Sequence, residues 1–121
     1  MNESSGKTVL IIDDEIMVRN VLRRMLALKG HEIFEATSGE AAIKMFEANP
    51  TRITNVLLDL SMPGMSGEAT FDALMKINPS VSIIVTTGFI SLNLKNSLLA
   101  KGAVTILEKP FEMDKLLKFI K

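Results

Sequence analysis

The chain has 121 residues, of which 47% are hydrophobic, and its 14 Lys and Arg residues balance 14 Asp and Glu residues. This length suits one domain with a substantial core, and the hydrophobic content argues against disorder. The absence of net charge gives no attraction to nucleic acid or anionic membranes, and the absence of cysteine excludes disulfides and thiolate metal sites. Because no signal-peptide core or membrane-length run is present, we expect a cytoplasmic, monomeric domain with a flexible tail over residues 1–6.

The first half of the chain alternates apolar runs with helical repeats. An aliphatic run predicts a buried strand over residues 9–12, and apolar residues at helical spacing then predict a helix that ends at Lys29-Gly30. Residues 31–36 alternate in the manner of a strand near a sheet edge. Thr37 and Glu40, three residues apart, resemble a capping box that opens a second helix.

The second half continues the alternation. An apolar run over residues 55–59 predicts a strand buried on both faces, followed by a loop rich in Pro and Gly. Ser66 can cap the helix that comes next. The remaining expected elements are strands over 81–87 and 104–107, a weakly amphipathic helix over 91–101, and a terminal helix with Leu116, Leu117 and Ile120 on one face.

Five strands alternating with five helices predict an α/β fold with a doubly wound, five-stranded parallel sheet. At this size the commonest strand order is the flavodoxin-like order 2-1-3-4-5. That order places the first and third strands side by side. Asp13 and Asp14, which follow the first strand, should therefore meet Asp59, which ends the third.

Three carboxylates that share a pocket repel one another, by roughly 4 kcal/mol for two charges at about 4 Å and an effective dielectric of 20. A hard divalent cation such as Mg²⁺ relieves this repulsion by taking oxygen ligands. Thr87 and Lys109 leave the fourth and fifth strands toward the same rim. A metal, an ammonium and a hydroxyl around one carboxylate would stabilise a phosphoryl group arriving on it.

Together these residues resemble the receiver domain of the response regulators of two-component signalling, including chemotaxis-type receivers and those of hybrid sensor kinases. The resemblance covers the chain from Lys7 to its end and implies a receiver domain over residues 7–121. It rests on four motifs in order, which are Asp13-Asp14-Glu15, Asp59 with Met62-Pro63-Gly64-Met65-Ser66-Gly67, Thr87-Gly88 and Lys109-Pro110-Phe111.

The resemblance implies a phosphorelay module that takes a phosphoryl group from a histidine kinase or a histidine phosphotransfer protein and then changes conformation. Such a domain is a signalling phosphoacceptor that loses its phosphate slowly, and not an enzyme. The resemblance also implies a cis Lys109-Pro110 bond. The resemblance makes Asp59 the phosphoacceptor. It implies an Mg²⁺ ion bound by Asp14, by Asp59, by the backbone carbonyl of Ser61 and, through a water, by Asp13. Thr87 and Lys109 would contact the phosphoryl group.

By the same resemblance, Met17, Val18, Val21 and Pro110 form the rim that docks the partner's helical bundle. One position departs from the family pattern. Ile106, three residues before the site lysine, stands where the family usually has Tyr or Phe. The aromatic switch that such a residue provides is therefore expected to be missing or small here.

Two other function classes compete with this interpretation. A phosphorylation-independent interaction domain would not need all five polar site residues, which are intact. A small Mg²⁺-dependent aspartyl phosphohydrolase would usually carry an Asp-x-Asp loop and a substrate cap, whereas this chain has Asp13-Asp14-Glu15 and little spare length. A flavin carrier would need a Ser, Thr and Gly-rich phosphate loop after the first strand.

Several polar residues are expected to have no part in this chemistry. Strand alternation should turn Thr86 to the face opposite the site threonine. His31, the only histidine, is interpreted as an exposed residue at the start of a strand. Arg19, Arg23 and Arg24 are interpreted as the solvated face of the first helix and not as a nucleic-acid patch.

Overall fold

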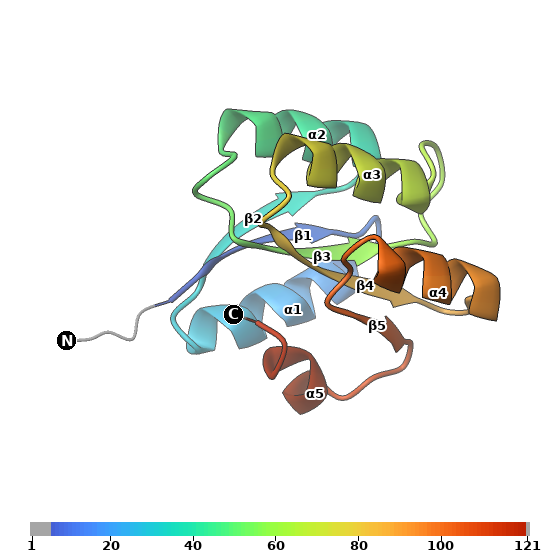
Figure 1. Cartoon of the computed structure of the whole chain (residues 1–121). Helices are drawn as coiled ribbons and strands as arrows, with labels where there is room; N and C mark the ends of the chain where they lie inside the picture. Colours follow the sequence, from blue (N-terminus) through green and yellow to red (C-terminus); the bar gives the residue numbers. More distant parts are fainter. Residues whose placement is uncertain (1–5, 121) are drawn as a thin grey trace.

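The computed structural model describes residues 6–120, which form five strands and five helices in alternation (Figure 1). The predicted tail lies outside the described residues except for Gly6. No helix within residues 6–120 is long and apolar enough to cross a membrane. In chain order the elements are β1 (Thr8–Ile12), α1 (Ile16–Leu28), β2 (Glu32–Ala36), α2 (Gly39–Ala48), β3 (Asn55–Asp59), α3 (Gly67–Ile77), β4 (Ser82–Thr87), α4 (Leu92–Ala100), β5 (Thr105–Glu108) and α5 (Met113–Leu117).

The strands form a single parallel sheet in the order β2-β1-β3-β4-β5, which confirms the predicted flavodoxin-like order. The register places Ile11 of β1 opposite Leu57 of β3, and Leu57 opposite Ile84 of β4. Every residue of β3 is buried, as its unbroken apolar run predicted. The carboxyl ends of β1, β3 and β4 therefore lie next to one another at one edge of the sheet.

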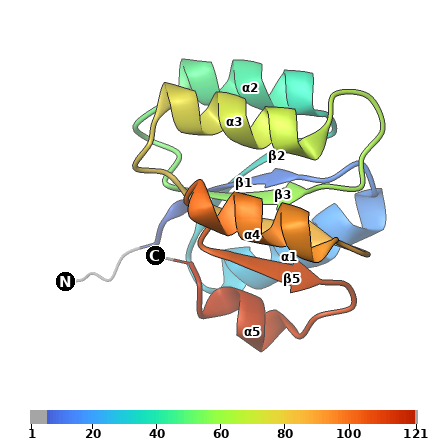
Figure 2. The same ribbon diagram turned by 45° about the vertical axis from the view of Figure 1, so that its right-hand side comes forward.

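Helices cover both faces of the sheet, with α2, α3 and α4 on one face and α1 and α5 on the other (Figures 1 and 2). Alternate strand residues supply the two cores because successive side chains point to opposite faces. Leu10 packs in the core that includes Phe71 of α3, and its neighbour Ile11 packs in the core that includes Leu22 of α1 and Leu116 of α5.

Two helix ends differ from their predictions. Ser38, and not Thr37, caps α2, because the helix begins at Gly39 and the Ser38 hydroxyl accepts a 3.1 Å hydrogen bond from the Ala41 N–H. The predicted capping box is therefore wrong by one residue. Helix α5 ends at Leu117, so Ile120 does not belong to it, although Ile120 still packs against the core between α1 and α5.

Helix α4 is held by few buried residues, as its weak pattern predicted. Ser91 caps it by accepting a 3.2 Å hydrogen bond from the Leu94 N–H. Along the helix Leu98 is buried, while Leu92 and Leu99 are exposed. Because apolar burial supplies most of a helix's stability in a protein, α4 is anchored mainly near its C-terminal end.

His31 is half-buried and not exposed as predicted. Its Nδ1 accepts a 2.9 Å hydrogen bond from the backbone N–H of Lys7. This bond joins the residues that precede β1 and β2, so His31 has a local structural contact, while its expected absence from the site chemistry stays a prediction. Burial lowers the pKa of His31, and the charge of Lys7 lowers it further.

Candidate functional site

Three carboxylates meet at the carboxyl edge of the sheet, as predicted. Asp13 follows β1 and Asp59 ends β3, and these strands pair in parallel. Asp14 completes the group, in which one oxygen from each carboxylate lies within 4.8 Å of the others. Asp13 and Asp59 are each only 2% exposed, whereas Asp14 is exposed.

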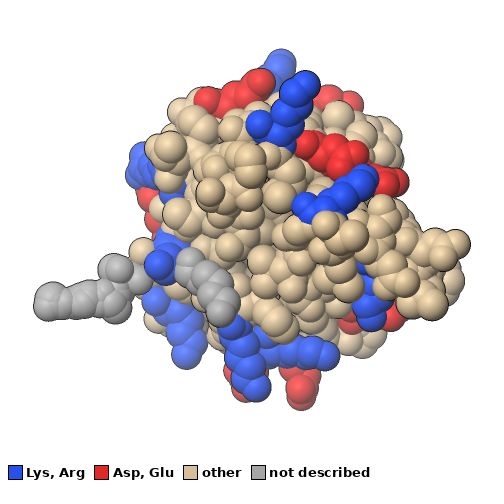
Figure 3. All heavy atoms as spheres, in the orientation of Figure 1, with Lys and Arg blue, Asp and Glu red and all other residues tan. Residues whose placement is uncertain are grey.

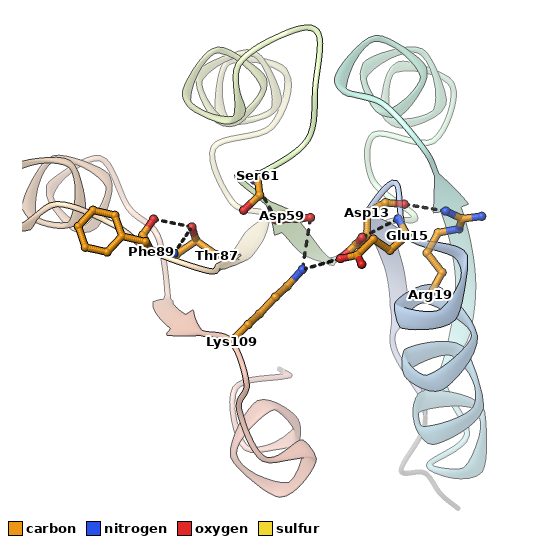
Figure 4. A network of polar contacts seen from close by, with 8 residues as sticks. All are labelled: Asp13, Glu15, Arg19, Asp59, Ser61, Thr87, Phe89 and Lys109. Atoms are coloured by element: carbon orange, nitrogen blue, oxygen red, sulfur yellow. Dashed lines mark hydrogen bonds and ion pairs between the residues drawn. The ribbon is translucent and has the colours of Figure 1, made fainter.

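The two buried carboxylates are held in the same way. Oδ1 of Asp13 accepts a 2.9 Å hydrogen bond from the Glu15 N–H, and Oδ1 of Asp59 accepts one of the same length from the Ser61 N–H. In both cases the donor lies two residues farther along the chain, so each acid closes its own local turn. This arrangement fixes both carboxyl groups and directs the second oxygen of each toward Lys109 (Figure 4).

Lys109 reaches from the end of β5 to the acids of β1 and β3. Its Nζ lies 3.2 Å from Oδ2 of Asp13, 3.4 Å from Oδ2 of Asp59 and 3.7 Å from Oε1 of Glu15. Burial alone would lower the pKa of Lys109, but the charges of Asp59 and Asp13 outweigh it and raise this pKa above its usual value. Burial raises the pKa of Asp13, with repulsion from Asp59 adding to it. The peptide bond between Lys109 and Pro110 is cis.

Thr87 is buried at the end of β4, but its hydroxyl is engaged with the loop before α4. The hydroxyl donates a 2.8 Å hydrogen bond to the Phe89 carbonyl and accepts a 3.3 Å bond from the Phe89 N–H (Figure 4). Thr86, and not Thr87, is the register partner of Asp59. In this structure the Thr87 hydroxyl is therefore engaged with the Phe89 backbone.

The four residues predicted to dock a partner lie together beside the site. They line an apolar groove of about 370 Å³ between α1 and the segment after β5. Met17 and Val21 are 77% and 52% exposed. Lys109 lines the same groove, so the groove opens next to the acidic pocket. The residues brought together are Met17, Val18, Val21 and Pro110.

Arg19 does not belong to the solvated helix face on which the sequence placed it. Its side chain is only 13% exposed, and it donates hydrogen bonds to the carbonyl of Asp13 and to Glu35 of β2. Arg23 also bonds Glu35, while Arg24 is exposed as predicted. No local pattern signals the contacts with Glu35, because Glu35 lies on β2 and the two arginines lie on α1.

The donor set fits a magnesium ion. Carboxylate oxygens are the hard ligands that Mg²⁺ prefers, and few protein ligands suffice because the ion keeps several waters. Asp13, Asp14 and Asp59 supply such oxygens within 4.8 Å of one another. Lys109 neutralises part of the charge of Asp13 and Asp59, whereas Asp14 is exposed to solvent.

Comparison with known proteins gives one consistent match. The family model described as "Response regulator receiver domain" matches residues 9–121. Chemotaxis protein CheY of Thermotoga maritima is 31% identical over 115 residues, covering 93% of each chain. Sporulation initiation phosphotransferase F of Bacillus subtilis is 29% identical over the whole chain and 93% of that protein. A chain of the CheX-CheY-BeF3-Mg²⁺ complex from Borrelia burgdorferi superposes with a TM-score of 0.89 at 28% identity, over 95% of this chain and 87% of that one.

Proposed function

Because this chain belongs to the response regulator receiver family, and is thus a phosphoacceptor domain of two-component signalling, we propose that its phosphoryl group is carried by Asp59. The observation that carries this assignment is the position of Asp59 at the centre of the site. Asp59 is buried, one of its oxygens lies within 4.8 Å of oxygens of Asp13 and Asp14, and its Oδ2 lies 3.4 Å from Nζ of Lys109. Its Oδ1 is held by the Ser61 N–H, so the carboxylate has a defined orientation.

We propose a phosphohistidine of a histidine kinase or of a histidine phosphotransfer protein as the donor. An oxygen of Asp59 forms a bond to phosphorus while the bond from phosphorus to the imidazole nitrogen breaks, and the imidazole keeps the electron pair. Lys109 would pair with a phosphoryl oxygen, and this pairing would replace its present ion pair with Oδ2 of Asp59. Thr87 would donate its hydroxyl to another oxygen after leaving Phe89.

We assign a magnesium site to Asp13, Asp14, Asp59 and the backbone carbonyl of Ser61. When bound, the ion would offset the negative charge that gathers where the phosphoryl group meets the carboxylates. The chain itself holds Asp13 and Asp59 through their local turns, so little reorganisation of these two acids is needed. Asp14 is exposed and is the acid most open to solvent ions.

The apolar groove beside Lys109 supports a docking role. A helical bundle that presents phosphohistidine would cover Met17 and Val21. Both side chains are exposed, and exposed apolar surface of this kind marks sites of protein interaction. Because Lys109 and Pro110 line the same groove, a partner seated there would bring its imidazole to the edge of the acidic pocket. Val18 would form the floor of this contact.

We further propose that the receiver domain spans residues 7–121, acts as a cytoplasmic monomer and is a phosphoacceptor without an enzyme's substrate turnover. Proteins, and not nucleic acids, are the proposed partners. The balance of 14 basic and 14 acidic residues supports this view. On the face shown in Figure 3, basic side chains lie next to acidic ones and to uncharged surface.

Intact-mass analysis after incubation with acetyl phosphate and Mg²⁺ tests the assignment. The wild-type chain should gain one phosphoryl group that is stable in acid and labile in base, and Asp59→Asn should gain none. Asp114→Asn, which removes an exposed acid of α5, is the matched control and should be labelled as the wild type is. Labelling of Asp59→Asn would refute the site, and an unlabelled wild type would favour a phosphorylation-independent interaction domain.

A further inference from the structure

Arg19 is the fourth residue of α1 and lies beside the turn that carries Asp13 and Asp14. Its Nη1 donates a 2.8 Å hydrogen bond to the backbone carbonyl of Asp13, and its Nε donates a 3.2 Å bond to Oε1 of Glu35. Figure 4 shows the guanidinium beside Asp13, on the side away from Lys109. A single planar guanidinium thus ties the turn after β1 to the neighbouring strand β2.

The turn that Arg19 holds carries two of the three acids. Asp13 and Asp14 lie between the end of β1 and the start of α1. The Glu15 side chain makes no capping hydrogen bond in the described structure, and the first turn of α1 has no acidic residue. The backbone of Asp13 is otherwise held by its own N–H, which donates a 3.2 Å bond to the carbonyl of Ala36. The Arg19 bond therefore fixes the other side of that backbone.

We propose that Arg19 is a positioning residue for metal binding, which holds the Asp13-Asp14 turn in the shape that receives Mg²⁺. This inference rests on the proposed function, since it assumes that the acidic pocket binds the ion. Arg19 itself touches neither the ion nor the phosphoryl group in this account. Its effect is to fix ligand orientation in advance, which residues behind a metal ligand commonly do.

Arg23 gives a matched control within the same cluster. Its Nη1 donates a 3.0 Å hydrogen bond to Oε2 of Glu35, the carboxylate that Arg19 also uses. The Arg23 side chain is more exposed than that of Arg19, at 42% against 13%, and among the described residues its hydrogen bond runs to Glu35. Replacing Arg23 therefore removes an ion pair between α1 and β2 but retains the contact between Arg19 and Asp13.

The experiment compares Mg²⁺ binding by the phosphate-free chain in the wild type, Arg19→Gln and Arg23→Gln. Isothermal calorimetry should show a dissociation constant raised roughly ten-fold in Arg19→Gln and unchanged in Arg23→Gln. Without metal, the amide resonances of residues 13–15 should move in Arg19→Gln and stay in place in Arg23→Gln. The acetyl phosphate labelling rate of Arg19→Gln should recover at saturating Mg²⁺, because the ion then compensates for weaker binding.

Three outcomes would overturn the inference. The first is wild-type affinity in folded Arg19→Gln, and the second is an equal loss in Arg23→Gln, which would assign the effect to the Glu35 ion pairs. If Arg19→Gln does not fold, Arg19→Lys is used in its place, because lysine keeps the charge but cannot donate from two nitrogens of one planar group. The third outcome is wild-type Mg²⁺ affinity in Arg19→Lys. A wild-type chain that binds no Mg²⁺ would refute the magnesium site as well, which separates the two failures.

Discussion

Lys109 Nζ lies 3.2 Å from Oδ2 of Asp13, and the two residues are 96 positions apart in the sequence. The same ammonium lies 3.4 Å from Oδ2 of Asp59. Because both carboxylates are 2% exposed, they depend on a neighbouring cation more than surface acids do. Before phosphorylation Lys109 therefore acts as a structural counter-ion for the acids it would later serve.

Replacement of Lys109 by Met should destabilise the metal-free chain by about 2 kcal/mol at pH 7.5, since it leaves two buried carboxylates without their shared ammonium. Saturating Mg²⁺ should reduce this difference, because the ion neutralises the same acids. Urea unfolding with and without Mg²⁺ measures both effects. Lys101→Met is the control. Lys101 also pairs with two acids, Glu68 and Asp72, but at an exposed site, so little loss and no added Mg²⁺ response are expected.

A loss of stability in Lys109→Met that Mg²⁺ does not reduce would contradict the counter-ion account. It would indicate instead that the lysine stabilises the chain through packing of its aliphatic stem.

Phosphorylation should act through Thr87 and the loop before α4. The Thr87 hydroxyl has one proton, so it cannot donate both to the Phe89 carbonyl and to a phosphoryl oxygen. If it donates to a phosphoryl group on Asp59, it must release the Phe89 carbonyl. Amide NMR with beryllofluoride, a phosphoryl mimic, should therefore show large shifts over residues 87–101. Thr87→Val, which lacks the hydroxyl, should be labelled at Asp59 but lose most of these shifts.

Ile106 should take little part in that change. It is 9% exposed and packs in the core with Leu98 of α4, and a β-branched side chain is stiff at its first torsion. Methyl resonances of Ile106 report its rotamer directly. A rotamer flip on addition of beryllofluoride would show that isoleucine can replace the usual aromatic residue in the switch.

Docking should depend on the apolar groove at α1. Met17→Glu places a charge on a side chain that is 77% exposed and should slow phosphoryl transfer from a phosphohistidine protein about ten-fold, a cost of about 1.4 kcal/mol. Labelling by acetyl phosphate should stay unchanged. Leu28→Glu is the control, because Leu28 lies on the same helix, is 81% exposed and does not line the groove. Equal slowing with both donors would point to a folding defect.

Stability should fall below neutral pH through His31. Its folded pKa lies below the unfolded value near 6.5, because burial and Lys7 disfavour the charged form. The neutral imidazole therefore contributes stability above pH 6.5 that is lost as the pH falls through the folded pKa. Protonation also removes the Nδ1 acceptor of the Lys7 N–H, a bond of about 1 kcal/mol at most.

His31→Asn tests this dependence, since Asn can accept the same hydrogen bond without titrating. As the pH falls from 7.5 to 5.0, the unfolding free energy of the wild type should decrease more than that of His31→Asn. Parallel pH curves for the two chains would exclude His31 as the titrating group.

The sequence by itself determined the order of the elements, because unbroken apolar runs specify buried strands and helical repeats specify the helices between them. The strand order was predicted as the commonest one for such a sheet, and the meeting of Asp13, Asp14 and Asp59 followed from that order because strand ends in a parallel sheet share an edge. The exact helix ends were less certain. Thr37 and Ser38 are both good caps, and the choice between them depends on where the helix geometry begins.

Only the tertiary structure decided which partners the polar side chains take. The Arg19 side chain is only 13% exposed because Glu35, 16 residues away on β2, and the Asp13 carbonyl accept its hydrogen bonds. Helical periodicity places Arg19 on a polar face but cannot say what packs against that face. The Thr87 hydroxyl likewise has two candidate partners, and the path of the loop after β4 brings the Phe89 carbonyl within 2.8 Å of it. Such choices depend on distances between segments, which no local pattern encodes.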